Sequence, residues 1–176
     1  MAARLSYELS CARLRELGLL DRDSTAPMPE RLPRYDDEPL GFSVFKACLA
    51  DGLDLSDLSL PRTFFGRAQI NGVSFRNTDL RESNMCWNGF VRTDFTGADL
   101  ARCDMRAALF TQVLFVEANL RGADLRRSSF IDCSFKGAGM KGAALTREQA
   151  DALPLSETQR HEIDWVEDGG AEPDGG

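Results

Sequence analysis

The stretch FTGADLARCDM, residues 95–105, decides the fold of this chain. Large apolar residues stand at positions 95, 100 and 105, and the same spacing of five continues on both sides without a break. Nineteen consecutive positions of this register are large and apolar, which indicates an internal repeat of five residues. The series is Leu55, Leu60, Phe65, Ile70, Phe75, Leu80, Met85, Phe90, Phe95, Leu100, Met105, Phe110, Phe115, Leu120, Leu125, Phe130, Phe135, Met140 and Leu145.

A second column of mostly small residues lies two positions before each large one, as at Ala98, Cys103 and Ala108. A period of five matches neither the 3.6 of a helix nor the 2 of a strand. It matches a chain that turns a corner every five residues, with one large and one small side chain per repeat inside a narrow shaft. Successive coils must then stack at about 4.8 Å, the strand spacing that pairs their backbone groups.

The repeat has the form A-[D/N]-L-x-x in Ala98-Asp99-Leu100, Ala118-Asn119-Leu120 and Ala123-Asp124-Leu125. In this form the chain resembles the pentapeptide-repeat family over about residues 43–147. The resemblance implies an all-β fold, a right-handed quadrilateral β-helix with four repeats, or 20 residues, in each coil. Extending the frame back through Phe45 and Ala50, with Ser43 and Cys48 in the small column, predicts 21 repeats and about five coils.

The segments outside the solenoid are expected to cap its ends, because a solenoid exposes unpaired edges there. Residues 1–42 read as a helix from Arg4 to Leu17 followed by a proline-rich acidic arm. Residues 148–166 read as a helical cap, since TREQ at 146–149 and SETQ at 156–159 both fit a capping box. We expect helices at roughly 147–153 and 157–165, and a disordered acidic tail at 167–176.

Length and composition predict a single cytoplasmic domain with extensions. The 176 residues contain no apolar stretch of the roughly 18 residues that a membrane helix needs, so we expect no membrane contact. The N-terminus carries charges and lacks the apolar segment of a signal peptide. Five cysteines with no CxxC pair do not suggest a disulfide framework.

Residues suited to catalysis or metal binding are few, and we expect no enzyme, no cofactor and no metal site. The single histidine, His161, has no evident nucleophile to serve as a base, and no cysteine–histidine cluster suits zinc. Cys103 and Cys133 fall in the inward column. Cys86 is predicted to face outward beside Trp87, as a reactive thiol or as a bystander. The resemblance implies that the aspartates before the large residues hydrogen-bond the backbone at corners.

The net charge of −7 is unevenly distributed along the chain. Residues 54–145 carry a net charge of +2, whereas residues 146–176 carry −7, so the solenoid itself is close to neutral. One side of the coils has an excess of acids, opposed only by Arg76 and Lys136. Its acidic residues, which we call the acidic face, are Asp54, Asp57, Asp94 and Glu117.

Apolar residues occupy outward positions on the side before the acidic face and, around the following corner, on the same side as the acids, and they suggest a contact surface. We call this set the apolar strip, and an alternative is that the terminal arm covers it. The strip consists of Val91, Leu109, Leu114, Val116 and Ile131. A further side carries arginines (Arg67, Arg106, Arg126, Arg127 and Arg147) and would suit nucleic acid, but the acidic tail and the lack of outward aromatic residues disfavour direct binding.

Two functions are compatible with this organisation. Stand-alone bacterial members of the family, the Qnr and MfpA types, dimerise, resemble duplex DNA and protect DNA gyrase or topoisomerase IV from inhibitors such as quinolones. The resemblance implies this function, although the near-neutral solenoid and the long N-terminal arm depart from that group. The alternative is a scaffold or adaptor that binds another protein through the apolar strip.

We also expect a homodimer through the C-terminal cap, with the contact residues Leu153, Leu155, Ile163 and Trp165.

Overall fold

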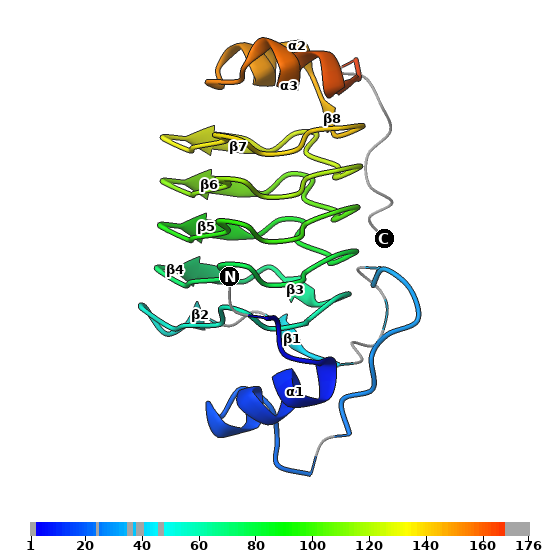
Figure 1. Ribbon diagram of the computed structural model, residues 1–176, viewed down its shortest axis with the longest axis vertical. Helices are drawn as coiled ribbons and strands as arrows, with labels where there is room; N and C mark the ends of the chain where they lie inside the picture. The colour runs from blue at the N-terminus through cyan, green and yellow to red at the C-terminus, as the bar shows by residue number, and fades with distance from the viewer. Residues whose placement is uncertain (1–2, 24, 35–36, 38–40, 46–47, 168–176) are drawn as a thin grey trace.

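A computed structural model describes residues 3–23, 25–34, 37, 41–45 and 48–167, with the backbone alone at 45 and 48. The chain forms a stack of flat coils with α1 at one end and α2 and α3 at the other (Figure 1). Of the predicted tail at 167–176, only Glu167 belongs to the described residues. The elements are α1 (Tyr7–Glu16), β1 (Ser43–Phe45), β2 (Cys48–Leu49), β3 (Phe64–Gly66), β4 (Gln69–Asn71), β5 (Gly89–Val91), β6 (Leu109–Thr111), β7 (Ser129–Ile131), β8 (Ala144–Leu145), α2 (Arg147–Asp151), α3 (Glu157–Glu162) and β9 (Asp164–Trp165).

The coils repeat every 20 residues and have four sides. Parallel pairing places Phe90 beside Phe110 and Phe110 beside Phe130 in the sheet β2-β4-β5-β6-β7. Isolated parallel bridges form the other columns at the same spacing, as between Asp79 and Asp99. This arrangement confirms the right-handed quadrilateral β-helix. We number the sides by the large residues that they carry: side 1 (65, 85, 105, 125, 145), side 2 (70, 90, 110, 130), side 3 (55, 75, 95, 115, 135) and side 4 (60, 80, 100, 120, 140).

The large apolar column fills the shaft. From Leu55 to Leu145 every member is at most 1% exposed except Phe130, which is partly buried. Phenylalanines on side 2 stack at ring-centroid distances of 5.2 Å between Phe90 and Phe110 and between Phe110 and Phe130. They meet a second ladder on side 3 edge to face, as between Phe110 and Phe115 at 5.3 Å.

The first coil departs from the predicted register by one residue. Val44, not Phe45, pairs with Phe65, and Leu49, not Ala50, pairs with Ile70. Phe42 and Val44 are each only 3% exposed, so they take the inward positions assigned to Ser43 and Phe45. A constant step of five fails here because the corner between Leu49 and Leu55 contains one extra residue. Gly52 turns that corner with φ of +79°, and its N–H donates to the carbonyl of Gly72.

The corners hold their shape through side-chain hydrogen bonds. Asp94 accepts from the N–H of Thr96 at 2.8 Å, and Asp79 accepts from the N–H of Arg81 at 3.1 Å. These are Asx turns, the role that the family resemblance implied for the aspartates. The residue two positions after each large residue has a positive φ at most corners, although it is often not glycine, as at Arg102 and Glu117.

Two glutamines close the C-terminal end of the solenoid. Gln149 and Gln159 each complete a capping box, at Thr146 and Ser156 respectively, so both predicted boxes are confirmed. Each Nε2 also donates to two carbonyls of the last coil. Gln149 bonds Leu125 O at 2.9 Å and Ser128 O at 2.8 Å. Gln159 bonds Phe135 O at 2.7 Å and Ala138 O at 3.0 Å.

The predicted terminal helices are present but shorter than expected. α1 lies within the range from Arg4 to Leu17, and its Leu14 is fully buried against the first coil. α3 ends at Glu162, so its predicted last turn is wrong. Residues 164–165 form β9 instead, which pairs with β8 and continues the 20-residue spacing.

The buried phenylalanine ladder predicts a large effect of Phe110→Ala. The variant should lose about 3–5 kcal/mol of unfolding free energy, because it removes a ring stacked on both faces and leaves a cavity. Thr111→Ala on the outward side of the same strand is the control, with a loss of less than about 1 kcal/mol. Urea denaturation measures both, and equal midpoints for the two variants would contradict this account of the shaft.

The glutamine caps predict that Gln159→Leu destabilises the chain although leucine has a similar volume. It would leave two carbonyls and the N–H of Ser156 without their partners, at a cost of about 1–3 kcal/mol. Thr158→Ala on the exposed side of α3 is the matched control. Thermal unfolding checks the pair, and a Gln159→Leu variant as stable as the control would rule out the capping role.

Candidate partner-binding surface

The apolar strip lies exposed along sides 2 and 3. Leu109, Leu114 and Ile131 are 44%, 40% and 50% exposed, and Val91 and Val116 are half-buried. The strands position them, since β5, β6 and β7 pair in register and place Val91, Thr111 and Ile131 in one column. The strip therefore spans three successive coils, with Thr111 between Val91 and Ile131 in this column.

The N-terminal arm does not cover the strip with any of its described residues. The carbonyl of Pro29 accepts from Arg62 at 2.6 Å, and that of Pro33 accepts from the buried side chain of Asn84 at 2.9 Å. Arg62 follows side 4 and Asn84 stands on side 1. The described arm thus contacts other sides of the coils, and the strip keeps its exposure.

The strip ends at β7, where the solenoid is incompletely closed. β7 is the terminal strand of its sheet, because the chain enters α2 where a further side 2 strand would follow. Phe130 is consequently the one member of the described large column that stays partly exposed. At β7 the exposed apolar surface is therefore supplied by two residues, the core residue Phe130 and the outward residue Ile131.

Trp87 borders the strip and was missed among the candidates from the sequence. It occupies the corner before β5 with φ of +60°, and it is 52% exposed. The expectation that outward aromatic residues are lacking is therefore wrong. An aromatic residue two positions after Met85, where the repeat turns outward, was the signal that could have identified it.

Cys86, next to Trp87, is not an outward thiol. It is 6% exposed, and burial raises the pKa of its thiol. Its Sγ lies 3.8 Å from the carbonyl oxygen of Asp104. The structure thus favours the bystander interpretation over the reactive one, because a protonated buried thiol is a poor nucleophile.

The acidic face is gathered on side 3, but more cations oppose it than the sequence indicated. Arg76 bonds Asp94 at 2.8 Å, as expected. Arg4, from the N-terminal segment, also donates to the carbonyls of Asn77 and Gly97 on the same side. The statement that only Arg76 and Lys136 oppose the acids is therefore wrong, since chain distant in sequence folds back there.

The carboxylates of the acidic face differ in their environments. Asp57 accepts a hydrogen bond from the side chain of Asn77 at 2.6 Å, whereas Asp54 and Glu117 are exposed. The pKa of the Asp54 carboxyl is held below its usual value chiefly by hydrogen bonds from Ser56. These two exposed carboxylates are the ones best placed to meet a basic partner.

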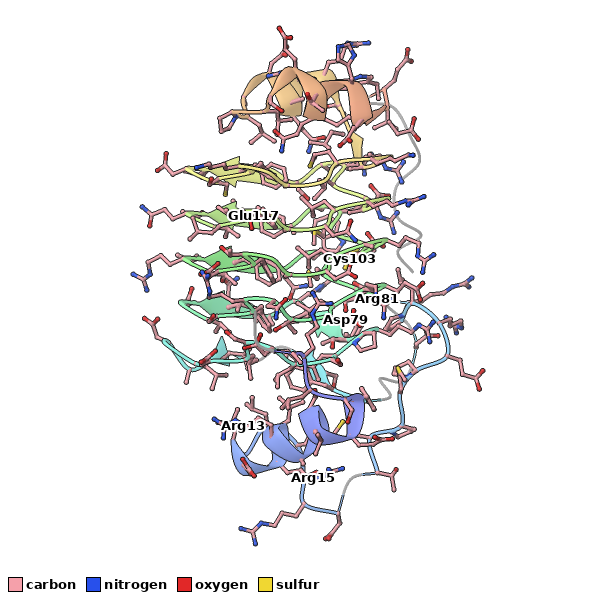
Figure 2. All side chains as sticks on the ribbon, in the orientation of Figure 1. Arg13, Arg15, Asp79, Arg81, Cys103 and Glu117 are labelled. Atoms are coloured by element: carbon pink, nitrogen blue, oxygen red, sulfur yellow. The ribbon has the colours of Figure 1, made fainter. Side chains whose placement is uncertain are left out.

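Most arginines of the coil sides are paired with an aspartate or with Glu82. Asp79 and Arg81 lie side by side (Figure 2), with Arg81 Nη2 at 2.7 Å from Asp79 Oδ2. Arg106 and Arg126 make the same bidentate pair with the aspartate two residues before each. Burial by itself would raise the pKa of the Asp104 carboxyl, but hydrogen bonds led by that from Arg106 hold the pKa below its usual value. These pairs weaken the nucleic-acid interpretation of side 1.

The C-terminal residues predicted to form a dimer divide into two groups. Leu153 and Ile163 are buried within the chain, where they help to cover the last coil. Leu155 and Trp165 are half-buried, and Arg147 lies over the Trp165 ring at 4.9 Å from its centroid. Only this second group has apolar surface left for a second copy.

Within the residues that the structure describes, no group of three or more histidine, cysteine, aspartate or glutamate side chains could hold a metal ion. His161 is exposed on α3. None of the described helices is long and apolar enough to cross a membrane.

Comparisons with solved structures agree with the fold. HetL, a pentapeptide repeat protein involved in heterocyst differentiation regulation from Nostoc, is 21% identical with a TM-score of 0.55, over 58% of this chain and 48% of HetL. A pentapeptide repeat protein of the Arabidopsis thaliana thylakoid lumen is 25% identical with a TM-score of 0.51, over 68% of this chain and 79% of its own. The fluoroquinolone resistance protein QnrB1 is 18% identical over 70% of this chain and 65% of its own, with a TM-score of only 0.31.

No match was found among the curated proteins. The family model for pentapeptide repeats matches eight copies, at residues 51–85, 90–113 and 114–147, which together make up over half of the chain. The match coincides with the coils that follow the irregular first corner. With its 20-residue coils and its inward columns of large and small residues, this chain belongs to the family of pentapeptide-repeat proteins.

Proposed function

We propose that this chain is a non-catalytic, cytoplasmic protein-binding solenoid whose partner contacts the apolar strip. The observation that carries the proposal is the exposure of Leu109, Leu114 and Ile131 on adjoining coils, with the described arm on other sides. Apolar side chains grouped on a rigid surface release water when a partner covers them. The coils are rigid because each is hydrogen-bonded to the next. Binding therefore costs little conformational entropy of the backbone.

The strip predicts that Leu109→Asp and Ile131→Asp remove partner binding while leaving the fold intact. Both side chains point outward, and a charge there would have to be desolvated under the partner. Tagged wild-type and variant chains would be used to capture proteins from the native cell, with quantitative mass spectrometry as the readout. We expect recovery of the specific partner to fall by about tenfold or more in either variant.

The matched control neutralises acids on the acidic face, with Asp54→Asn and Glu117→Gln in one chain. This control should retain the partner, because it leaves the strip unchanged. A partner that survives the strip variants and is lost from the control would overturn the proposal. Circular dichroism of each purified variant separates lost binding from lost folding.

A type II topoisomerase, DNA gyrase or topoisomerase IV, is the second candidate partner. It is favoured by the exposed carboxylates of Asp54 and Glu117 on one side of a straight stack of coils. A DNA mimic competes for a basic surface and needs such carboxylates. Arg4 and Arg76 reduce the negative potential there, which is why we rank this candidate second. Self-association, which this mode would use, would rest on Leu155 and Trp165.

Gyrase supercoiling with and without a fluoroquinolone tests the second candidate. A DNA mimic should restore supercoiling in the presence of the drug, and Asp54→Asn with Glu117→Gln should reduce that protection, more strongly at low salt. The strip variants should protect as well as the wild type does. Wild-type protein without effect at any concentration would exclude gyrase and leave the adaptor function in place.

A further inference from the structure

The last coil of the solenoid leaves part of its backbone unpaired on side 3. In the coil below, the N–H groups of Phe115 and Glu117 each donate to a carbonyl of the next coil at 2.8 Å. The corresponding donors of the last coil are the N–H groups of Phe135 and Gly137. Neither has an acceptor among the residues that the structure describes. Two main-chain donors therefore face the C-terminal end of the stack.

A proline prevents the following segment from pairing with this edge. The 20-residue spacing that joins Leu114 to Ser134 in a parallel bridge would place position 154 beside Ser134. Ser134 donates its own N–H to Val113 O at 3.0 Å, so residue 154 would have to donate to Cys133 O. Pro154 has no N–H and cannot form this bond. Within the described chain, the edge on side 3 thus keeps one carbonyl and two N–H groups unpaired.

The chain closes sides 4 and 1 of this end by itself. The N–H of Met140 donates to Glu162 Oε2 at 3.1 Å, and the N–H of Gly142 donates to Glu162 O at 2.7 Å. On side 1, β9 pairs with β8. Side 3 differs from these two sides because no described acceptor meets its donors.

A cleft of about 580 Å³ lies next to these donors, at the capped end of the stack (Figure 1). Phe135 and Gly137 line the cleft from the last coil, and Pro154 and Thr158 line it from the cap. Ligand sites in proteins have volumes of about 300–1,000 Å³. The unpaired donors thus lie at a space large enough for a short peptide.

The lining of the cleft selects a hydrogen-bond acceptor and not a charge. Gln159 Nε2 donates to the carbonyls of Phe135 and Ala138, so these two acceptors are already used. Lys136 and Glu162 contribute one positive and one negative side chain, which leaves no excess of either sign between them. A ligand of this cleft is therefore expected to present acceptors to the main-chain donors.

We propose that the cleft binds an extended segment of a partner polypeptide, which pairs in parallel with side 3 of the last coil. The coils below are paired in this way along the same side. Two carbonyls of the segment, two residues apart, would accept from Phe135 and Gly137, and one of its N–H groups would donate to Cys133 O. The inference goes beyond the proposed function, because no residue of the apolar strip lines the cleft.

An inorganic anion fits this edge less well than a strand does. Anion sites built from main-chain groups use successive N–H groups that converge on one point. The donors of Phe135 and Gly137 are two residues apart, and in the coil below the matching pair reaches two different carbonyls. The carboxylate of Glu162 also lines the cleft. Phosphate is therefore an outcome of the test and not the proposed ligand.

Amide hydrogen exchange measured by NMR on the full chain tests the open edge. The amides of Phe135 and Gly137 should exchange about a hundredfold faster than those of Phe115 and Glu117, because only the latter pair is hydrogen-bonded. Slow exchange at Phe135 and Gly137 in the free chain would show that the chain pairs with its own edge, and this result would overturn the proposal.

The binding test selects random dodecapeptides displayed on phage against the full chain. A selected peptide should slow exchange at both Phe135 and Gly137, whereas inorganic phosphate should not. Single N-methyl groups placed along the peptide should weaken it about tenfold at the position that donates to Cys133 O. Affinity should change little with salt, since the contacts are main-chain bonds.

A variant of the cleft wall provides a matched comparison. Gly139 lines the cleft, and a Cβ there would meet no heavy atom within 4 Å, so Gly139→Trp can be accommodated by the fold. Its indole ring should obstruct the cleft and weaken the peptide about tenfold or more. Lys141→Trp, outside the cleft on the same coil, should leave the affinity unchanged. The exchange measurement uses the wild-type chain and does not depend on either variant.

The remaining outcomes separate this inference from the function of the strip. Leu109→Asp should leave peptide affinity unchanged, and a peptide lost from that variant would belong to the strip and contradict the cleft. The proposal is wrong if no peptide is enriched above empty phage, or if the bound peptide leaves exchange at Phe135 and Gly137 as fast as before. It is equally wrong if Gly139→Trp binds as well as Lys141→Trp does, or if phosphate slows the two amides and no peptide does.

Discussion

The hydrogen bonds between successive coils are the interaction on which the rest of this structure depends. The N–H of Phe95 donates to Leu114 O in the next coil at 2.8 Å, and the N–H of Leu114 donates back to Thr93 O at 3.0 Å. The same pair of bonds recurs around all four sides, so the coils cannot slide relative to one another. Side chains 20 residues apart are consequently held about one strand spacing apart in columns.

That spacing explains how the surface is organised. Like charges at about 4.8 Å repel, so the column of Arg62, Glu82 and Arg102 alternates in sign. Where aspartates stack instead, as Asp79 does on Asp99 and Asp104 on Asp124, an arginine lies close to both carboxylates. Glu82 lies between Arg62 and Arg102 and bonds both, and Arg81 reaches Asp99 of the next coil at 3.6 Å in addition to its own Asp79. Pairing of this kind neutralises most coil sides. The exposed apolar side chains of the strip make it the surface whose composition differs most from a solvated face.

Agreement between sequence and structure is close where the period is unbroken and fails where it changes. The columns from Leu55 onward could be predicted because each residue there repeats the environment of the residue 20 positions earlier. The register of Phe45 and Ala50 could not, because one extra residue at the first corner moves every preceding side chain by one position. The spacing of five also predicted that Cys86 faces outward, and Cys86 is nevertheless buried. The spacing carries no information about the N-terminal arm, which folds back and contacts Asn84, two residues away.

The sequence by itself determined the coil, the two inward columns and both capping boxes, because each follows from spacing along the chain. Only the tertiary structure decided which surface is left open. The arm contacts sides 1 and 4 and Arg4 reaches the acidic face, through bonds between residues 33 to 93 positions apart. It also decided that corner residues such as Arg102 and Trp87 adopt a left-handed backbone. No local preference of these side chains favours it; the bonds to the neighbouring coils impose that conformation and so turn Trp87 outward beside the strip.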